Sequence, residues 1–136
     1  PGAELHSVDR DQGALRRQEG RVRARFPAAR VRYRRADFTA DLGLAGLDGV
    51  LMANSLHFER DQPAVLELVH GYLRGGGRLI LIEYDFERGN PWVPHPLSYR
   101  SWRRLAPEAR FVDTRLLATH PSRFPGAMYA ALSHAR

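Results

Sequence analysis

Apolar and polar residues recur along the chain with periods that predict its secondary structure. The segment 47–58 reads LDGVLMANSLHF, in which the apolar run at 50–53 is typical of a buried strand. The run ends in polar and ring-bearing side chains. Because open α/β sheets bind ligands at the carboxyl ends of their strands, this segment is predicted to form the floor of a binding site.

The N-terminal part of the chain predicts a strand, a helix and a second strand. Residues 3–9, AELHSVD, predict a strand that ends in an acid. Asp11 is a candidate N-cap for a helix over 12–25, whose inner face would carry Leu15, Val22 and Phe26. VRYRR at 31–35 predicts a strand with one solvent-exposed face. Residues 39–46 show no long period and form a loop or a short helix.

A second helix and the most hydrophobic strand follow. Asp61 as N-cap and Pro63 in the first turn predict a helix over 62–73 with four inward residues, Val65, Leu68, Val69 and Tyr72. Glycines at 75–77 are predicted to cap this helix, because a phosphate loop would instead lead from a strand into a helix N-terminus. RLILIEY at 78–84 predicts a strand buried on both faces that ends at Glu83 and Tyr84.

The remaining residues predict a loop, a helix and two strands. Residues 85–97 are rich in proline and glycine, and a helix is expected at about 98–105. Strands at 111–117 and 128–132 flank a loop at 119–126 and are expected to form an antiparallel pair. The alternation of strands and helices before them predicts an α/β fold with a parallel sheet and right-handed crossovers.

Composition narrows the possible classes of protein. With 136 residues, 43% of them hydrophobic and 26% charged, the chain has the size and composition of one globular domain. Its apolar runs are far shorter than the roughly 20 residues of a membrane span, and no signal-peptide pattern opens the chain, which favours a cytoplasmic location and no membrane partner. Cysteine is absent, so thiol nucleophiles and thiolate metal sites are excluded. The six histidines lack HxxxH or HExxH spacing, which disfavours a metal site.

The net charge of +6 comes from 21 basic residues, all of them arginine. Nine of these arginines fall between Arg16 and Arg35, a concentration that suits either a nucleic-acid face or an ordinary solvated surface. The solvated surface is the favoured interpretation, and RNA binding remains an alternative.

The order of these landmarks resembles the class I S-adenosylmethionine-dependent methyltransferases, and the match extends over nearly the whole chain. The resemblance implies a Rossmann-like three-layer sandwich with a mostly parallel sheet and an antiparallel final strand. In that family an acid after the second strand binds the ribose hydroxyls, and Asp9, with Arg10 beside it in SVDRD, stands in the matching place. Asp37 and Phe38 in RRADFTAD match the pair that lies by the adenine. LDGVLMANSLHF and LRGGGRLILIE are similar to later family motifs.

The family's glycine-rich loop after the first strand has no counterpart here, because PGAELHSVD resembles the entry to the second strand. The fold is therefore expected to be N-terminally incomplete. Loss of a central strand would expose two strand edges, and pairing of two chains into a homodimer is one hypothesis for covering them.

Residues of the opening segment and the later loop are candidates for the rest of the site. Asn54 and Ser55 are expected to line the methionyl end of the cofactor, and His57 is a candidate general base near neutral pH. The ring-bearing residues Phe58, Tyr84, Trp92 and Tyr99 are candidates for a pocket that takes a flat substrate.

Each role has a structural alternative. Asp9 would merely cap the following helix, Asp37 would be an acidic loop residue beside a core phenylalanine, and His57 would be a surface residue before the next helix. The pocket aromatics would be packed loop residues.

The sequence thus predicts a single methyltransferase-like domain over 1–136. Its expected function is methyl transfer from S-adenosylmethionine to a small molecule, with weak or no activity of this chain alone. The alternative is a non-catalytic binding or dimerisation module that keeps the fold without the cofactor.

Overall fold

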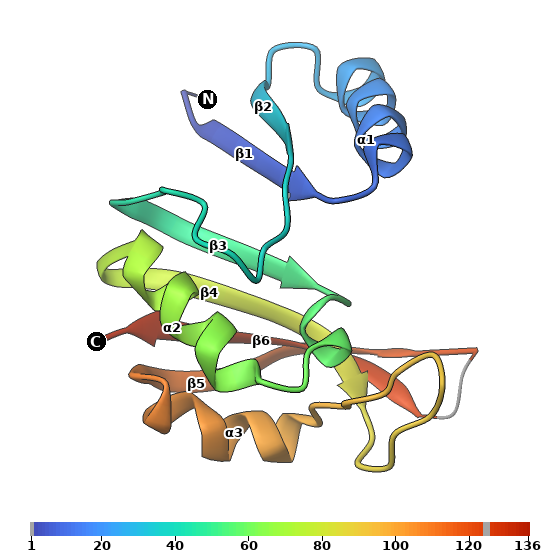
Figure 1. The fold of residues 1–136 in the computed structure, drawn as a ribbon, viewed down its shortest axis with the longest axis vertical. Helices are drawn as coiled ribbons and strands as arrows, with labels where there is room; N and C mark the ends of the chain where they lie inside the picture. The colour runs from blue at the N-terminus through green and yellow to red at the C-terminus, as the bar shows by residue number, and fades with distance from the viewer. Residues whose placement is uncertain (1, 124–125) are drawn as a thin grey trace. The chain divides into compact units, whose positions relative to one another are not determined.

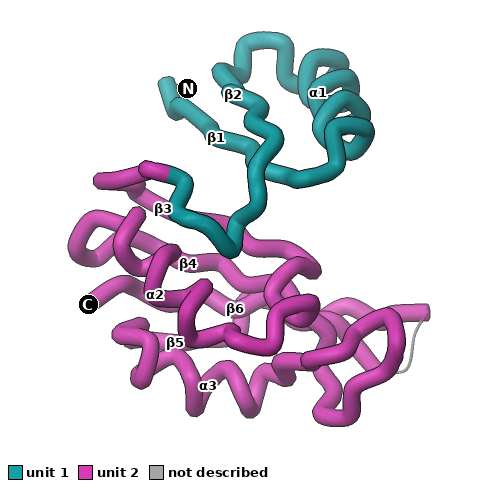
Figure 2. The backbone as a smooth tube through the Cα atoms, viewed as in Figure 1, with its two compact units in different colours: residues 1–42 teal, residues 43–136 magenta. Residues whose placement is uncertain are grey.

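A computed structural model describes residues 2–123 and 126–136 of the chain. Two compact units make up the structure, the first ending at Leu42 and the second beginning at Gly43 (Figure 2). The single-domain organisation expected from the sequence stays a prediction. No helix formed by the described residues has the length and apolar character that a membrane span requires.

The first unit is a strand–helix–strand element. Strand β1 (Glu4–Asp9) pairs in parallel with β2 (Arg30–Arg35), and helix α1 (Gln12–Arg25) connects them (Figure 1). Helix α1 starts where predicted because the side chain of Asp11 accepts a hydrogen bond from the Gly13 N–H.

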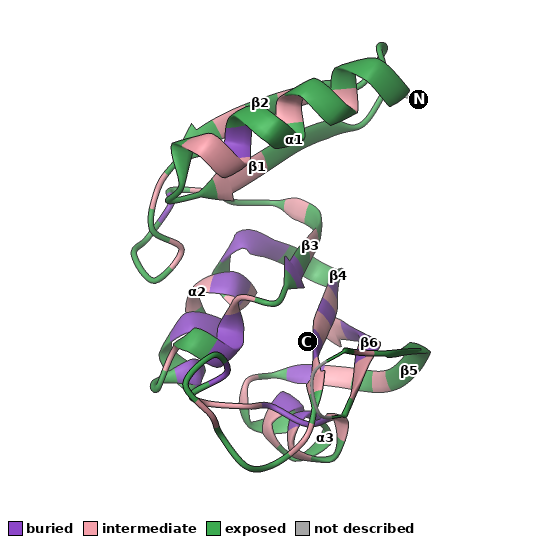
Figure 3. Cartoon of the chain, turned by 90° about the vertical axis from the view of Figure 1, so that its right-hand side faces the viewer, coloured by how far each residue is buried: buried purple, intermediate pink, exposed green. Residues whose placement is uncertain are grey.

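The inner face of α1 is only partly as expected. Leu15 is buried and Val22 is half-buried, whereas Phe26, beyond the helix end, is exposed. Most of the remaining helix is exposed, as its colours in Figure 3 show, and its arginines point into solvent. This arrangement follows from the sequence, since a helix with so few apolar residues offers little surface to bury.

The second unit is built on a four-stranded sheet in the order β3-β4-β6-β5. Strand β3 (Leu47–Ala53) is parallel to β4 (Leu73–Asp85), and the final strand β6 (Ala127–Ala135) runs antiparallel between β4 and β5 (Phe111–Pro121). The predicted α/β class, the antiparallel last strand and the antiparallel pairing of the last two strands are confirmed.

Two helices cover this sheet. Helix α2 (Gln62–Tyr72) follows the short 3₁₀ helix η1 (Leu56–Phe58), and α3 (Tyr99–Glu108) precedes β5 (Figure 1). The core of the second unit lies between these helices and the strands, with Trp102 and Phe111 among its fully buried side chains. Figure 3 shows how the buried residues of α2 gather on one side of that helix.

Several local predictions are corrected by the structure. Helix α2 buries Leu66 where Leu68 was expected, and its C-cap is Leu73, so the glycines at 75–77 belong to the start of β4 and do not cap the helix. Helix α3 and strand β5 extend further than predicted, to Glu108 and Pro121. Of the loop expected at 119–126, residues 124 and 125 lie outside the described part of the chain.

The two apolar strands are also less buried than their sequences suggest. In β3 only Met52 is buried, and Leu51 is 63% exposed, because β3 is an edge strand of its sheet within the described residues. In β4, Leu79 and Leu81 are fully buried, while Ile80 and Ile82 on the opposite face are half-buried. An uninterrupted apolar run therefore did not mean burial on both faces.

Candidate active site

The first unit holds four of the predicted cofactor residues, Asp9, Arg10, Asp37 and Phe38, at or just after the carboxyl ends of its two strands. The Ala36 N–H donates to the Asp9 carbonyl oxygen at 3.1 Å, which holds the two strand ends side by side. Oδ1 of the Asp9 carboxylate accepts a hydrogen bond from the Asp11 N–H at 2.8 Å. The alternative that Asp9 caps α1 is wrong, because Asp11 is the cap. The second carboxylate oxygen of Asp9 has no partner among the residues that the structure describes.

Asp37 lies in a tight turn just after β2. Its Oδ1 accepts hydrogen bonds from the N–H and the hydroxyl of Thr39, at 2.9 and 2.7 Å. These two bonds lower the pKa of the Asp37 carboxyl below its ordinary value of 3.8, and the positive charge of nearby Arg10 lowers it further. The carboxylate is therefore ionised at neutral pH, with half-buried Phe38 next to it in the chain.

These groups fit the nucleoside part of S-adenosylmethionine chemically. A carboxylate oxygen of Asp9 that accepts no other bond suits the vicinal hydroxyls of a ribose, which are both donors. The Asp37 carboxylate suits the exocyclic amine of an adenine, and the ring of Phe38 offers an apolar surface beside it.

In the second unit the chain turns sharply at Asn54, where β3 ends. Asn54 has a φ of 50°, in the left-handed region that asparagine tolerates better than most residues. Its N–H donates to the Ile82 carbonyl at 2.9 Å, so the turn is tied to the neighbouring strand β4. This turn directs the chain into η1, which places His57 over the end of β4.

His57 and Glu83 form a buried pair at this point. The imidazole Nδ1 lies 2.6 Å from Oε2 of Glu83, and the backbone N–H of His57 donates to Oε1 at 3.2 Å. The two residues are 2% and 0% exposed. Such a deeply buried carboxylate would be costly without partners, and both of its oxygens are satisfied by the same residue.

The pair determines what the imidazole can do. An ionised carboxylate only accepts hydrogen bonds, so in the neutral imidazole Nδ1 carries the hydrogen and Nε2 presents its lone pair. Nε2 has no partner among residues 2–123 and 126–136. His57 is thus held in the tautomer and orientation of a general base, and the alternative of a surface histidine is wrong for a residue that is 2% exposed.

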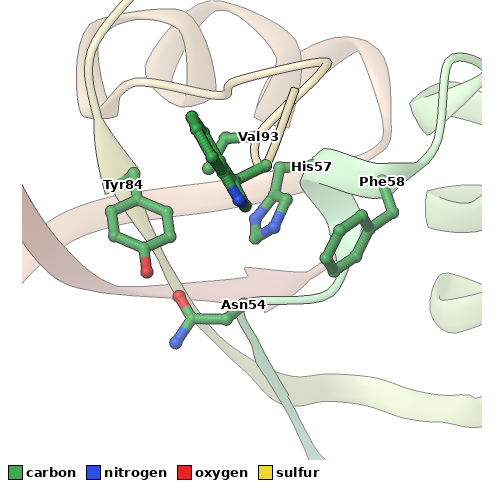
Figure 4. Close-up of a pocket in the computed structure, with 6 residues that line it drawn as sticks. Asn54, His57, Phe58, Tyr84 and Val93 are labelled. Atoms are coloured by element: carbon green, nitrogen blue, oxygen red, sulfur yellow. The ribbon is translucent and has the colours of Figure 1, made fainter. Parts of the chain in front are cut away.

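A cavity of about 190 Å³ adjoins the free side of the imidazole. It is lined by Asn54, His57, Phe58, Tyr84, Trp92 and Val93. The ring centroid of His57 lies 4.3 Å from that of Phe58 and 5.7 Å from that of Tyr84. In the view of Figure 4 the His57 ring lies between these two aromatic residues. Five of the predicted site residues, from the segment after β3, from the end of β4 and from the loop at 90–95, therefore meet in one place.

The loop that closes one side of the cavity is anchored by hydrogen bonds. The His95 N–H donates to the His57 carbonyl at 3.0 Å, and the buried Gln62 side chain donates to the His95 carbonyl at 2.9 Å. Nearer the cavity, the Asn90 side chain accepts from the N–H groups of Trp92 and Val93, both at 2.9 Å. The backbone under Trp92 is therefore held in place although its side chain is 66% exposed.

Two of the predicted site residues lie elsewhere in the second unit. Ser55 is next to the turn but does not line the cavity. Tyr99 begins α3 and lines a separate open hollow of about 340 Å³, together with Arg100, Arg103 and Arg104. Its ring packs edge-on against Tyr129 at 5.5 Å, which is a structural contact.

Sequence reasoning gave no site role to Glu83, Gln62 or Val93. The sequence does contain a signal for Glu83, because a carboxylate on the buried face of an apolar strand needs a hydrogen-bonding or charged partner. His57, which follows the preceding strand of the sheet, is the nearest candidate for that partner. The contributions of Gln62 and Val93 depend on the path of the loop, for which the sequence offers no signal.

Comparisons with known proteins agree with this fold. The family model described as methyltransferase domain matches residues 1–81, and no curated protein matches the chain. Solved structures with the same fold include a DszA carbon methyltransferase, with 19% identity and a TM-score of 0.73. Another is 1,6-didemethyltoxoflavin-N1-methyltransferase from Burkholderia thailandensis, solved with S-adenosylhomocysteine bound, with 19% identity and a TM-score of 0.74. The S-adenosylmethionine-dependent methyltransferase SibL shares 23% identity with a TM-score of 0.69.

These similarities cover 97%, 98% and 100% of this chain. The chain spans only 40%, 62% and 45% of the three structures in turn. At such identities the structures show the fold, and the family model shows the family. S-adenosylmethionine is the cofactor of that family. The chain therefore belongs to the methyltransferase domain family, with the Rossmann-like fold of the class I S-adenosylmethionine-dependent methyltransferases.

Proposed function

We propose that the protein containing this chain transfers a methyl group from S-adenosylmethionine to a small-molecule acceptor bound in the cavity beside His57. The observation that carries the proposal is the buried His57–Glu83 pair, whose free Nε2 adjoins that cavity in a chain of the methyltransferase domain family. A buried carboxylate that holds a histidine at the lining of a cavity is typical of catalytic sites, which supports catalysis over a non-catalytic module.

Each unit contributes its own residues to this function. In the first unit Asp9 accepts hydrogen bonds from the ribose hydroxyls, while Asp37 and Phe38 contact the adenine and Arg10 helps to keep Asp37 ionised. In the second unit Asn54 and Ser55 lie at the end of β3, where the family resemblance assigns the methionyl end of the cofactor.

The cofactor supplies an electrophilic methyl carbon on a positively charged sulfur. His57 Nε2 removes the proton from the acceptor's O–H, N–H or acidic C–H group, and Glu83 stabilises the resulting imidazolium. Loss of the proton leaves the acceptor atom with the electron pair that would take up the methyl group, and the cofactor would leave as a neutral thioether. The proton leaves His57 for solvent after the product departs.

Calorimetric titration with S-adenosylhomocysteine tests the proposal, using the chain together with any residues encoded before Pro1. Binding is expected, and Asp9→Asn should weaken it about tenfold, because a charge-assisted hydrogen bond is roughly twice as strong as a neutral one. Asparagine keeps the bond to the Asp11 N–H, so the turn should survive. Glu19→Gln, a half-buried acid on α1 that pairs with Arg23, is the control and should leave binding unchanged. Absence of binding to the unsubstituted protein would exclude methyl transfer by this family's route and favour a non-catalytic module.

A further inference from the structure

The cavity beside His57 is lined by exposed aromatic side chains, which methyl transfer alone does not require. Phe58 is 52% exposed and Trp92 is 66% exposed, although both are large and apolar. Exposed aromatic side chains that gather around a cavity mark a binding surface more often than scattered ones do. Their position is fixed, because η1 and the loop at 90–95 are joined by the bond between His95 and His57.

Two neutral hydrogen-bonding side chains line the cavity beside the base. Within the described residues neither the Tyr84 hydroxyl nor the Asn54 side-chain amide makes a hydrogen bond, and both residues line the cavity together with His57 (Figure 4). The pocket therefore combines aromatic walls with one base and two neutral hydrogen-bonding groups. No arginine lines it, in a chain with 21 basic residues, all arginine.

We infer that the methyl acceptor is a planar aromatic ring acid: a flat ring that carries an ionisable O–H or N–H and a second hydrogen-bonding group. This inference rests on the proposed function and specifies its substrate class. The ring lies against Phe58 and Trp92, because aromatic faces attract each other through offset or edge-on packing. Its ionisable hydrogen points to His57 Nε2, and the second hydrogen-bonding group bonds to the Tyr84 hydroxyl or the Asn54 amide.

The volume and charge of the cavity support this class over others. About 190 Å³ is below the usual 300–1,000 Å³ range of drug-sized ligand pockets, so one or two fused rings fit and a long chain does not. A permanently anionic acceptor would meet no cation in the lining, so a neutral acid that ionises only when it reaches His57 is the better match.

A coloured ring acid tests the inference directly. 4-Nitrophenol is colourless when neutral and yellow when ionised, so its absorbance reports proton transfer to the protein. Near the pH at which half of the free probe is ionised, binding should increase the yellow form. His57→Gln should abolish that increase while the fold persists, since glutamine still offers a donor to Glu83. Circular dichroism would verify that the fold is retained.

The walls are tested by a second set of variants. Trp92→Ala should weaken binding of 4-nitrophenol about tenfold, and Trp92→Phe should restore most of it, as expected for ring packing. Phe26→Ala removes an aromatic residue that is 57% exposed but does not line the cavity, and should have no effect. Cyclohexanol, which has neither a flat ring nor an ionisable hydroxyl, should not compete with the probe.

The possible outcomes separate this inference from the proposed function. If the protein binds S-adenosylhomocysteine but 4-nitrophenol neither binds nor ionises, the acceptor is not a ring acid and the inference is overturned. Equal competition by cyclohexanol would overturn it as well. If 4-nitrophenol binds and ionises but S-adenosylhomocysteine does not bind, the ring site stands and the methyl-transfer function fails.

Discussion

Substitution of Glu83 separates the structural role of the buried pair from its chemical role. Glu83→Ala removes the acceptor for two donors, the Nδ1–H and the backbone N–H of His57, at a site where Glu83 is 0% exposed. A buried donor without a partner costs roughly 1–3 kcal/mol, and breaking a buried charged pair costs about 3–5 kcal/mol in total. We therefore expect Glu83→Ala to lower the free energy of unfolding by about 4 kcal/mol.

Glu83→Gln keeps the shape and one acceptor oxygen, so its effect on stability should be much smaller. Exchanging a charge-assisted hydrogen bond for a neutral one costs about 1 kcal/mol, partly offset because a neutral amide is easier to bury than a carboxylate. The rate of methyl transfer by Glu83→Gln should nevertheless fall about 10²–10⁴-fold, which is the usual contribution of a general base. The amide N–H of glutamine would donate to Nδ1, which moves the imidazole hydrogen to Nε2 and removes the lone pair from the cavity.

Urea unfolding followed by circular dichroism measures the first effect, and methyl transfer in the presence of S-adenosylmethionine measures the second. A loss of less than about 1 kcal/mol in Glu83→Ala would show that the pair is not a buried structural element. Full activity in Glu83→Gln would refute the argument that Glu83 holds His57 as a base.

Three further predictions concern stability. Backbone hydrogen bonds at the start of α1 lower the pKa of the Asp11 carboxyl below its ordinary value of 3.8. The ionised carboxylate therefore stabilises the fold above pH 3.8, and this stabilisation is lost as acid protonates it. The helix signal in circular dichroism should fall over that acid range. Burial raises the pKa of Tyr129 above its ordinary value, so in an ultraviolet titration one tyrosine should stay un-ionised until alkaline unfolding. Tyr129→Phe should lower the free energy of unfolding in urea by about 1–3 kcal/mol, because the Leu97 carbonyl loses its hydrogen-bond donor. Gly77→Ala should lower the free energy of unfolding by about 1–3 kcal/mol, since the new Cβ would lie 2.8 Å from a backbone oxygen. Gly75→Ala is the control, because no atom lies within 4 Å of its new Cβ, and it should not show this steric cost.

The sequence by itself determined most of the secondary structure and the fold class. Helix α1 and the start of α2 could be placed because Asp11 and Asp61 are N-caps whose bonds are local, made within three residues along the chain. The order of strands and helices predicted the α/β class, and the spacing of Asp9 and Asp37 after successive strands matched a known family. Such signals lie in short segments, so a sequence carries them completely.

The tertiary structure decided burial and the partners of the site residues. The apolar run in β3 could not reveal that Leu51 is 63% exposed. The exposure of a strand residue depends on the position of its strand in the sheet, and β3 has only one neighbouring strand among the described residues. The sequence marked His57 as a weak candidate and left Glu83 without a role. Their pairing joins residues 26 positions apart through a left-handed turn at Asn54, and only the folded chain brings the carboxylate to the imidazole. The chemistry of the site therefore depends on a long-range contact that no local pattern records.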